Sequence, residues 1–417
     1  MLPVLVLPIL ALAPLGMSRV GILLTTLSLL GIVAMADLGA SASVITRVAR
    51  YAAAGDERLS HRAQAEALLL AAAMGCITAV AGMIIALGDV GHFVFPRSSS
   101  ELQQEATLAI AIFVIANGLH MPLAVAYRIR HALHEGHFAN SWQALAALIN
   151  FAAGVACLYT GHGVPALVAA LMAGSLGLGV MHAAIQLRRD AGVRRALAST
   201  SPRQVVEFVR YSGPYFGTQI IFAVAYSLDA TVVAMLLGAE SAARYALADR
   251  IFSTITILIS VRTLRIWALF SSFMGQDKRL RAVQLLRVEF VKLSLIATAM
   301  AAGLSLSFPI LSSRFGLRVG DVTVVTLLGM ALWRVIESAG GAVAAFMYSV
   351  DAARFVVITG TATAILALTL KILLCQRFGI SAIPLSMSVI YIGCSLIPCI
   401  LFIRAGNRRP GEMRVSR

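Results

Sequence analysis

Asp229 and Arg250 are ionisable residues in the second half of the chain that lie within mostly apolar stretches. Asp229 and Arg250 fall in the runs 213–237 and 243–261, which a short connection near 239–240 joins. Each lies about ten residues from that connection, which would put both roughly 15 Å deep in a bilayer. Ionisable residues at such depth face a cavity or a partner. The spacing predicts either an Asp229–Arg250 ion pair or an arginine held ready for phosphate oxygens.

Three further residues could bind an anionic substrate. Asp249 adjoins Arg250 and points about 100° away from it on a helix, so it cannot simply neutralise its neighbour. Arg47 and Arg50 lie at i and i+3 on one helical face. They could attract pyrophosphate headgroups, or they could be the positive charges that anchor the cytoplasmic side of a membrane protein. The candidate substrate-binding residues are therefore Arg250, Asp229, Asp249, Arg47 and Arg50.

Three other charged residues are candidates for gating. Asp37 follows the apolar run 20–36, where it could act as a gate residue or cap a helix. Arg334 and Glu337 lie at i and i+3, which predicts a local salt pair or a gate between two halves of the chain.

The remaining polar residues of the apolar runs have structural interpretations. Lys371 lies near the outer end of the run 355–374, where we expect its amine to reach the membrane surface. His120 and His182 are single histidines in apolar runs and are expected to form hydrogen bonds between helices. We expect no metal site and no cofactor.

The composition predicts an all-α polytopic membrane protein. Of the 417 residues, 59% are hydrophobic and 13% are charged, whereas a soluble domain is about half apolar and about a quarter charged. One crossing needs about 20 mostly apolar residues, and the chain holds about twelve such runs. They are 2–15, 20–36, 65–87, 106–127, 139–159, 164–187, 213–237, 243–261, 288–311, 322–336, 355–374 and 380–403.

The net charge of +15 comes mainly from arginines, and these lie mostly between the apolar runs. Basic residues gather in alternate connections, namely 47–62, 128–130, 188–210, 262–287 and 404–417. Positive residues of membrane proteins collect in cytoplasmic loops, so both termini are expected in the cytoplasm. A basic face with interleaved aromatic residues is absent from the sequence, which argues against nucleic acid as a partner.

Short motifs recur between the two halves of the chain. Leu15-Gly16 recurs as Leu237-Gly238, and Asp56-Glu57-Arg58-Leu59 recurs as Asp277-Lys278-Arg279-Leu280, at offsets of about 222 and 221 residues. Two parallel six-helix repeats around a central cavity are expected, a transporter design. The predicted parts are an N-terminal half (1–187), a basic cytoplasmic linker (188–210), a C-terminal half (211–403) and a basic cytoplasmic tail (404–417).

Several of these motifs resemble those of a known family. The stretch from Ala36-Asp37-Leu38-Gly39 to Arg47-Val48-Ala49-Arg50-Tyr51 resembles the second-helix signature of bacterial polysaccharide flippases. Tyr211-Ser212-Gly213-Pro214, and Leu237-Gly238 followed by Tyr245-Ala246-Leu247-Ala248-Asp249-Arg250, resemble the second half of the same proteins. These are the O-antigen and exopolysaccharide exporters of the multidrug/oligosaccharidyl-lipid/polysaccharide superfamily.

The resemblance implies a function that the residues alone do not. It implies alternating access and a cargo of undecaprenyl-pyrophosphate-linked oligosaccharide, moved from the cytoplasmic to the periplasmic leaflet of a bacterial inner membrane. Membrane lipids, a glycan polymerase and a chain-length regulator are the expected partners. In related lipid II flippases a matching Tyr-x-x-Ala-Asp-Arg stretch places its arginine toward the cavity, which is the position of Arg250 here.

Other functions remain open or are disfavoured. The sequence has no Gly-rich phosphate-binding loop before a lysine and no Gly-x-Ser-x-Gly motif, which argues against ATP hydrolysis and against an enzyme. A drug/cation antiporter of the same superfamily is the nearest alternative, although Asp37 lies too near the cytoplasmic end to serve as its deep carboxylate. An integral-membrane glycan polymerase and a structural scaffold are more remote alternatives.

Overall fold

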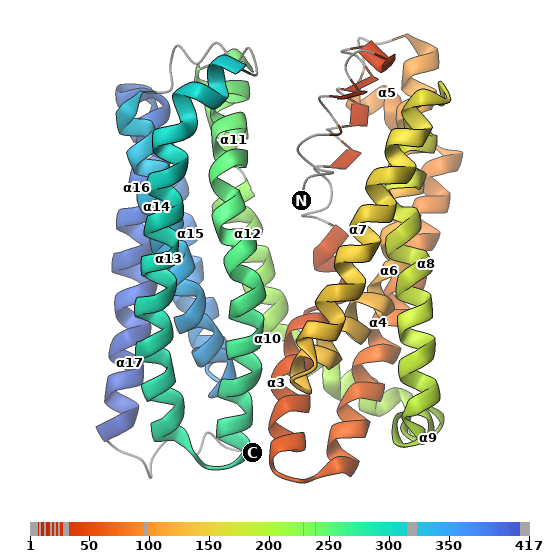
Figure 1. The fold of residues 1–417 in the computed structure, drawn as a ribbon, viewed down its shortest axis with the longest axis vertical. Coiled ribbons are helices and arrows are strands. Elements are labelled where there is room, and N and C mark those ends of the chain that lie inside the picture. The colour runs from red at the N-terminus through yellow and green to blue at the C-terminus, as the bar shows by residue number, and fades with distance from the viewer. Residues whose placement is uncertain are drawn as a thin grey trace. The chain divides into compact units, whose positions relative to one another are not determined.

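A computed structural model describes residues 7, 10–11, 14–16, 19–20, 22–23, 26–27, 33–95, 99–227, 229–237, 239–314 and 323–408. Within these ranges the ordered elements are helices and no strand occurs (Figure 1). The chain divides into two compact units, Met1–Phe216 and Gly217–Arg417. Most of the predicted first run, 2–15, lies outside the described residues.

The N-terminal unit consists of long apolar helices joined by short connections. A 3-10 turn, η1 (Ala34–Asp37), precedes them. The helices are α3 (Ala40–Ala53), α4 (Glu57–Leu87), α5 (Val90–Val94), α6 (Ser100–Ala132), α7 (Gly136–Tyr159), α8 (Val164–Arg189) and α9 (Ala191–Ser199), and α10 (Pro202–Ser227) begins in this unit. The predicted linker, 188–210, is thus mostly helical and includes α9.

Small residues allow α4 and α6 to pack closely. A Cβ atom built on Gly118 of α6 would lie 2.6 Å from the carbonyl oxygen of Gly75 on α4 and 2.8 Å from the backbone nitrogen of Ala79. Helices in membranes associate through such small residues, because lipid provides no hydrophobic drive for helix pairing. The α4–α6 contact therefore depends on glycine at position 118.

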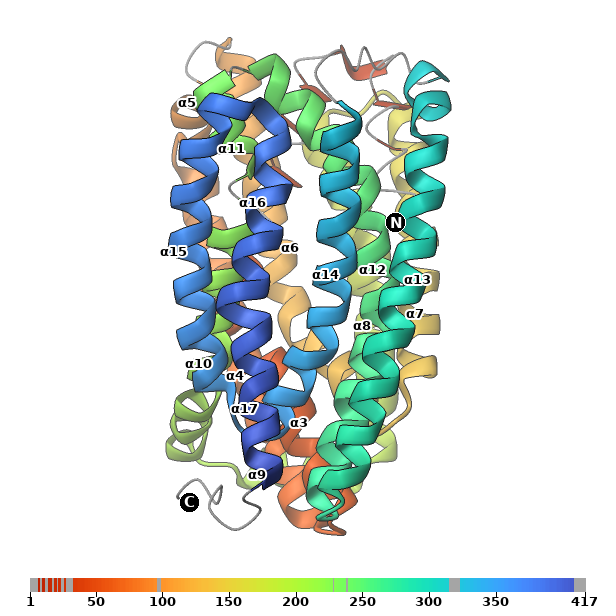
Figure 2. The same cartoon turned by 90° about the vertical axis from the view of Figure 1, so that its left-hand side faces the viewer.

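The C-terminal unit is arranged around α14 (Val324–Ser349), most of whose residues are buried. Helix α14 packs against α12 (Ala239–Gly275), α13 (Arg279–Arg314) and α16 (Ala382–Tyr391). Figure 2 shows α14 between α16 and α13. The unit also holds α11 (Asp229–Leu237), α15 (Ala353–Phe378), the 3-10 turn η2 (Gly379–Ser381), the π-helical turn η3 (Ile392–Leu396) and α17 (Ile397–Arg408).

Eight helical stretches of the described chain are long and apolar enough to cross a membrane. The last of them, Ala353–Ala405, includes α15 and the continuous α16–η3–α17 segment, so it contains two long helices. Large apolar side chains lie on the outer surface, among them Leu306 of α13, which is 81% exposed. Such exposure is unfavourable in water and is expected in lipid. The chain is therefore a multi-pass membrane protein.

Candidate functional site

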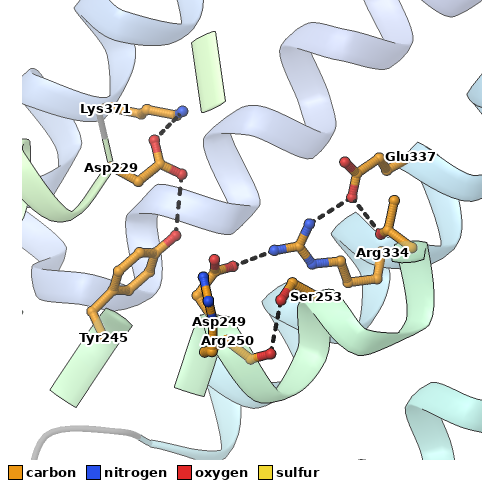
Figure 3. Close-up of polar contacts among 9 residues, drawn as sticks. Asp229, Tyr245, Asp249, Arg250, Ser253, Arg334, Glu337 and Lys371 are labelled. Carbon is orange, nitrogen blue, oxygen red and sulfur yellow. Dashed lines mark hydrogen bonds and ion pairs between the residues drawn. The ribbon is translucent and has the colours of Figure 1, made fainter. Parts of the chain in front are cut away.

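One face of α12 carries polar residues into the interior of the C-terminal unit. Tyr245, Asp249 and Thr256 lie at i, i+4 and i+11, a spacing that places them along one side of a helix. Their partners come from α11 and α14 of the same unit, and Lys371 of α15 contacts one of these partners, Asp229 (Figure 3). The contacts form two groups, one at Asp229 and one at Arg334.

The first group is a buried ion pair with a tyrosine. The Nζ atom of Lys371, on α15, donates to Oδ1 of Asp229, on α11, at 2.5 Å. The hydroxyl of Tyr245 donates to Oδ2 of the same carboxylate at 3.2 Å. Lys371 is 1% exposed, and Tyr245 is also buried. Each oxygen of Asp229 therefore has a donor, as a carboxylate in a low-dielectric environment requires.

The second group joins one arginine to two carboxylates. Arg334 donates from one terminal nitrogen to Oδ1 of Asp249 at 2.5 Å and from the other to Oε2 of Glu337 at 2.6 Å. The hydroxyl of Thr256 donates to the same Glu337 oxygen at 2.8 Å. The planar fork of a guanidinium suits this bridging arrangement, whereas an ammonium would not reproduce it.

The two groups differ in charge balance. Lys371 neutralises Asp229 in the first group. In the second group the single positive charge of Arg334 faces Asp249 and Glu337, which leaves one negative charge in excess. Because charge is costly in a membrane interior, this imbalance makes the second group the more polar of the two.

The structure gives a mixed result for the predicted residues of this unit. The local Arg334–Glu337 pair is confirmed. The predicted Asp229–Arg250 pair is not what the structure shows, since Asp229 contacts Lys371 and Tyr245 instead. Arg250 lies beside Asp249, about 100° around the helix from the polar face of α12. Its side chain is exposed, and its backbone oxygen accepts from Ser253 at 2.7 Å.

The prediction for Lys371 is wrong. Instead of reaching the membrane surface, its amine is buried against Asp229. The reason is the packing of α11 against α15, which supplies a counter-ion within the unit. A sequence signal existed, since an ionisable residue in an apolar run is by default a functional candidate. The contributions of Tyr245 and Thr256 had no comparable signal, because a hydroxyl is tolerated in many helix positions.

Arg47 of the N-terminal unit is held by a carboxylate and by aromatic rings. Its NH1 atom donates to Glu66 of α4 at 2.9 Å, and Glu66 is 2% exposed. The guanidinium carbon lies 4.9 Å from the ring centre of Tyr211 and 5.3 Å from that of Phe208. Cation–π contacts of this kind stabilise a guanidinium. Arg50 lies in the last turn of the same helix, α3.

Asp37 acts as a helix cap, as one of its two interpretations predicts. Its Oδ1 accepts from the backbone nitrogen of Gly39 at 2.9 Å, and its Oδ2 accepts from that of Ser41 at 3.0 Å. Both contacts are at the start of α3, where backbone N–H groups lack helical partners. Its role in gating stays a prediction.

The environment of His182 differs from the prediction of an interhelical hydrogen bond. Its ring stacks on Tyr127 with the ring centres 4.4 Å apart, and Phe138 and Trp142 also lie beside it. Within the described part of the chain, both buried ring nitrogens lack a hydrogen-bond partner. Aromatic packing between α6, α7 and α8 takes the place of the expected hydrogen bond.

Solved structures share this fold. A MATE transporter of Vibrio cholerae aligns with a TM-score of 0.84 at 11% identity, covering 99% of this chain and 94% of that one. An outward-facing MATE multidrug resistance transporter of the MOP superfamily aligns with a TM-score of 0.82 at 16% identity, covering 97% and 92%. A MATE protein in a straight conformation gives 0.79 at 16% identity, covering 98% and 94%. The fold is thus the twelve-helix, two-repeat fold of these proteins.

The sequence identifies the family. A family described as polysaccharide biosynthesis protein matches residues 1–266, which is more than half of the chain. No protein of curated function matches the sequence. The fold defines a helical, multi-pass membrane protein. Within that class, the chain belongs to the polysaccharide biosynthesis protein family, which confirms the resemblance drawn from its motifs.

Proposed function

We propose that this protein is a flippase that moves undecaprenyl-pyrophosphate-linked oligosaccharide from the cytoplasmic to the periplasmic leaflet of a bacterial inner membrane. The observation that carries the proposal is the match to a polysaccharide biosynthesis family in a chain with a transporter fold. A membrane protein of polysaccharide biosynthesis without ATP-binding motifs fits the transfer of a finished lipid-linked unit better than it fits the synthesis of one.

The proposal gives Arg250 the role of binding the cargo pyrophosphate. Its side chain is exposed, and no ion-pair partner for it occurs in the described ranges. It lies next to Asp249, whose carboxylate already binds Arg334. A guanidinium with open donors can bind two phosphate oxygens at once. Arg47 and Arg50 would attract the same headgroup at the cytoplasmic side.

In the same proposal, the Arg334 group couples cargo binding to a change of conformation. Arg334 joins α12 to α14 through Asp249, and Glu337 joins α14 to α12 through Thr256. These contacts would have to break for the two helices to move relative to each other. The excess negative charge of the group would favour its rearrangement when a cation arrives. Asp37 would act as a gate residue at the start of α3.

A drug/cation antiporter is the second candidate, and the likeness to MATE transporter structures is the observation that favours it. An antiporter for organic cations needs an accessible acidic group. The carboxylates of Asp229, Asp249, Glu289 and Glu337 each already bind a cationic side chain. This pairing favours the flippase, in which arginines rather than carboxylates meet the cargo.

Depletion of the protein in its bacterial host would distinguish the two candidates. For a flippase, lipid-linked oligosaccharide should accumulate on the cytoplasmic leaflet, surface polysaccharide should decrease, and drug susceptibility should not change. For an antiporter, lipid-linked intermediates should stay normal while susceptibility to cationic drugs rises. A second depletion of any related exporter in the same cells would reveal redundancy.

A further inference from the structure

A polar pocket of about 270 Å³ lies within the N-terminal unit, between α6, α7 and α8. Helix α6 provides His120, Tyr127 and Arg128 at i, i+7 and i+8, and α7 provides Gln143 and Asn150 at i and i+7, so each set lies on one helical face. Ser175 completes the polar lining from α8. Figure 1 shows the three helices running alongside one another in this unit.

The wall of the pocket formed by α7 and α8 is held in one arrangement. The side-chain nitrogen of Asn150 donates to Ser175 Oγ at 2.8 Å, and its oxygen accepts from the backbone nitrogen of Gly174 at 2.8 Å. A Cβ atom on Gly174 would lie 2.7 Å from the backbone oxygen of Ala146, so the two helices approach closely at this point. The polar wall is therefore in place before a ligand arrives.

Two lining residues lack the partners that their chemistry requires. Arg128 is half-buried in a membrane-spanning helix, and no described carboxylate lies within ion-pair distance of it. Asp37 is a carboxylate near enough to act on it electrostatically, but the two side chains form no ion pair, and the oxygens of Asp37 accept backbone N–H groups. Tyr127 is 4% exposed, and its buried hydroxyl has no hydrogen-bond partner among the described residues.

These observations define the ligand by its chemistry. A guanidinium in a membrane-spanning helix that has no ion-pair partner among the described residues can bind an anion, and phosphate oxygens match its planar donors. Pockets for drug-sized ligands usually measure about 300–1,000 Å³, so this one suits a headgroup rather than a whole lipid-linked oligosaccharide. Arg128 directly follows the apolar run 106–127, at the end of α6 that the charge pattern predicts to be cytoplasmic.

We propose that this pocket binds the pyrophosphate of a lipid headgroup, with Arg128 as the principal contact. The inference rests on the proposed function for the source of the pyrophosphate, because it makes the pocket the place where cargo is loaded from the cytoplasmic leaflet. Tyr127 and Gln143 would donate to the same oxygens. The site is separate from Arg250, which belongs to the C-terminal unit.

Binding to the purified full-length protein in detergent micelles tests the proposal without any transport step. The probes are farnesyl pyrophosphate, inorganic pyrophosphate and farnesol, measured by isothermal titration calorimetry. Farnesyl pyrophosphate should bind the wild type and farnesol should not. Arg128→Gln should weaken binding about ten- to a hundredfold, the effect of losing a charge-assisted contact. Arg128→Lys should recover part of the affinity.

Matched variants make the result specific. Arg188→Gln removes an exposed arginine of α8 outside the pocket and should bind like the wild type. If Arg128→Gln proves too unstable to measure, Gln143→Leu takes its place. This variant lies at the exposed α7 side of the pocket and should also weaken binding. Equal binding by the wild type, Arg128→Gln and Gln143→Leu would overturn the proposal, as would no binding of farnesyl pyrophosphate to the wild type.

The probes also separate this proposal from the proposed function. If inorganic pyrophosphate binds as tightly as farnesyl pyrophosphate and depends on Arg128 equally, the site recognises the anion without the lipid. The ligand is then a soluble pyrophosphate rather than a lipid headgroup. If Arg128-dependent binding is found but depletion leaves lipid-linked oligosaccharide normal, the site stands and the flippase proposal fails. If depletion shows a flippase but binding does not depend on Arg128, the pocket inference fails alone.

Discussion

The Nζ atom of Lys371 lies 2.5 Å from Oδ1 of Asp229, although the two residues are 142 positions apart in the chain. The pair joins α15 to α11 inside the C-terminal unit, and Lys371 is almost fully buried. Burying a single charge is strongly unfavourable, and here each residue neutralises the buried charge of the other. The pair fixes how α11 packs on α15.

Removing one member of this pair should therefore destabilise the protein. Lys371→Met leaves Asp229 as an uncompensated buried carboxylate, and we expect a loss of about 3–5 kcal/mol. The double variant Asp229→Asn with Lys371→Met should recover most of that loss, because neither charge remains. Thermal denaturation of the purified protein in detergent measures both.

Lys278→Met, at an exposed lysine, is the control and should change stability by less than about 0.5 kcal/mol. A single Lys371→Met variant as stable as the wild type would contradict the account.

The Arg334 group predicts an order of effects rather than one value. Arg334→Gln leaves Asp249 and Glu337 facing each other without a cation, so we expect a loss of about 3–5 kcal/mol. Glu337→Gln removes the excess negative charge and keeps a group that can accept from Thr256, so the loss should stay below about 1.5 kcal/mol. Chemical denaturation of the two variants side by side measures the difference. A larger effect for Glu337→Gln than for Arg334→Gln would show that charge balance does not govern this group.

Two glycines of the N-terminal unit form a matched pair for helix packing. Gly118→Ala places a Cβ atom 2.6 Å from the Gly75 oxygen, so α4 and α6 must separate, at a cost of about 1–3 kcal/mol. Gly177→Ala in α8 meets nothing within 4 Å, and its better helix propensity should stabilise the protein by up to about 1 kcal/mol. Melting temperatures of the two variants should move in opposite directions. Equal shifts would mean that the α4–α6 contact is not limited by Gly118.

Apolar runs were sufficient to predict most of the helices. The predicted runs 65–87, 106–127, 139–159 and 164–187 lie within α4, α6, α7 and α8. An apolar run long enough to cross a membrane predicts a helix, because a backbone in lipid must satisfy its own hydrogen bonds. The predicted end at Ile336 is wrong, since α14 continues to Ser349. Glu337, the apparent stop, is accommodated because Arg334 and Thr256 bind it.

The candidate site was less predictable than the helices. Depth in the membrane could be counted from the sequence for Asp229 and Arg250, and the i and i+3 spacing singled out Arg334 and Glu337 as candidates. Their partners depend on which helices pack together and on helix rotation, which one sequence does not specify. For this reason Lys371 could not be assigned to Asp229, although an isolated lysine in an apolar run carried a signal.

Arg250 should affect transport without affecting the fold. Its side chain is exposed, and it makes no side-chain ion pair within the described ranges, so Arg250→Ala should shift stability by less than about 0.5 kcal/mol. Loss of its guanidinium should nonetheless abolish translocation if it binds the cargo pyrophosphate. Arg250→Lys, which keeps the charge but not the fork, should retain partial transport.

Reconstitution tests the central claim most directly. Vesicles containing purified protein and a fluorescent undecaprenyl-pyrophosphate oligosaccharide are exposed to a membrane-impermeant quencher, which reads the cargo in the outer leaflet. With the wild type, the protected signal should decline with time as cargo crosses. With Arg250→Ala or in empty vesicles, only the cargo that started in the outer leaflet should be quenched. A protected signal that stays constant with folded wild-type protein, under an ion gradient of either direction, would contradict the assignment as a flippase.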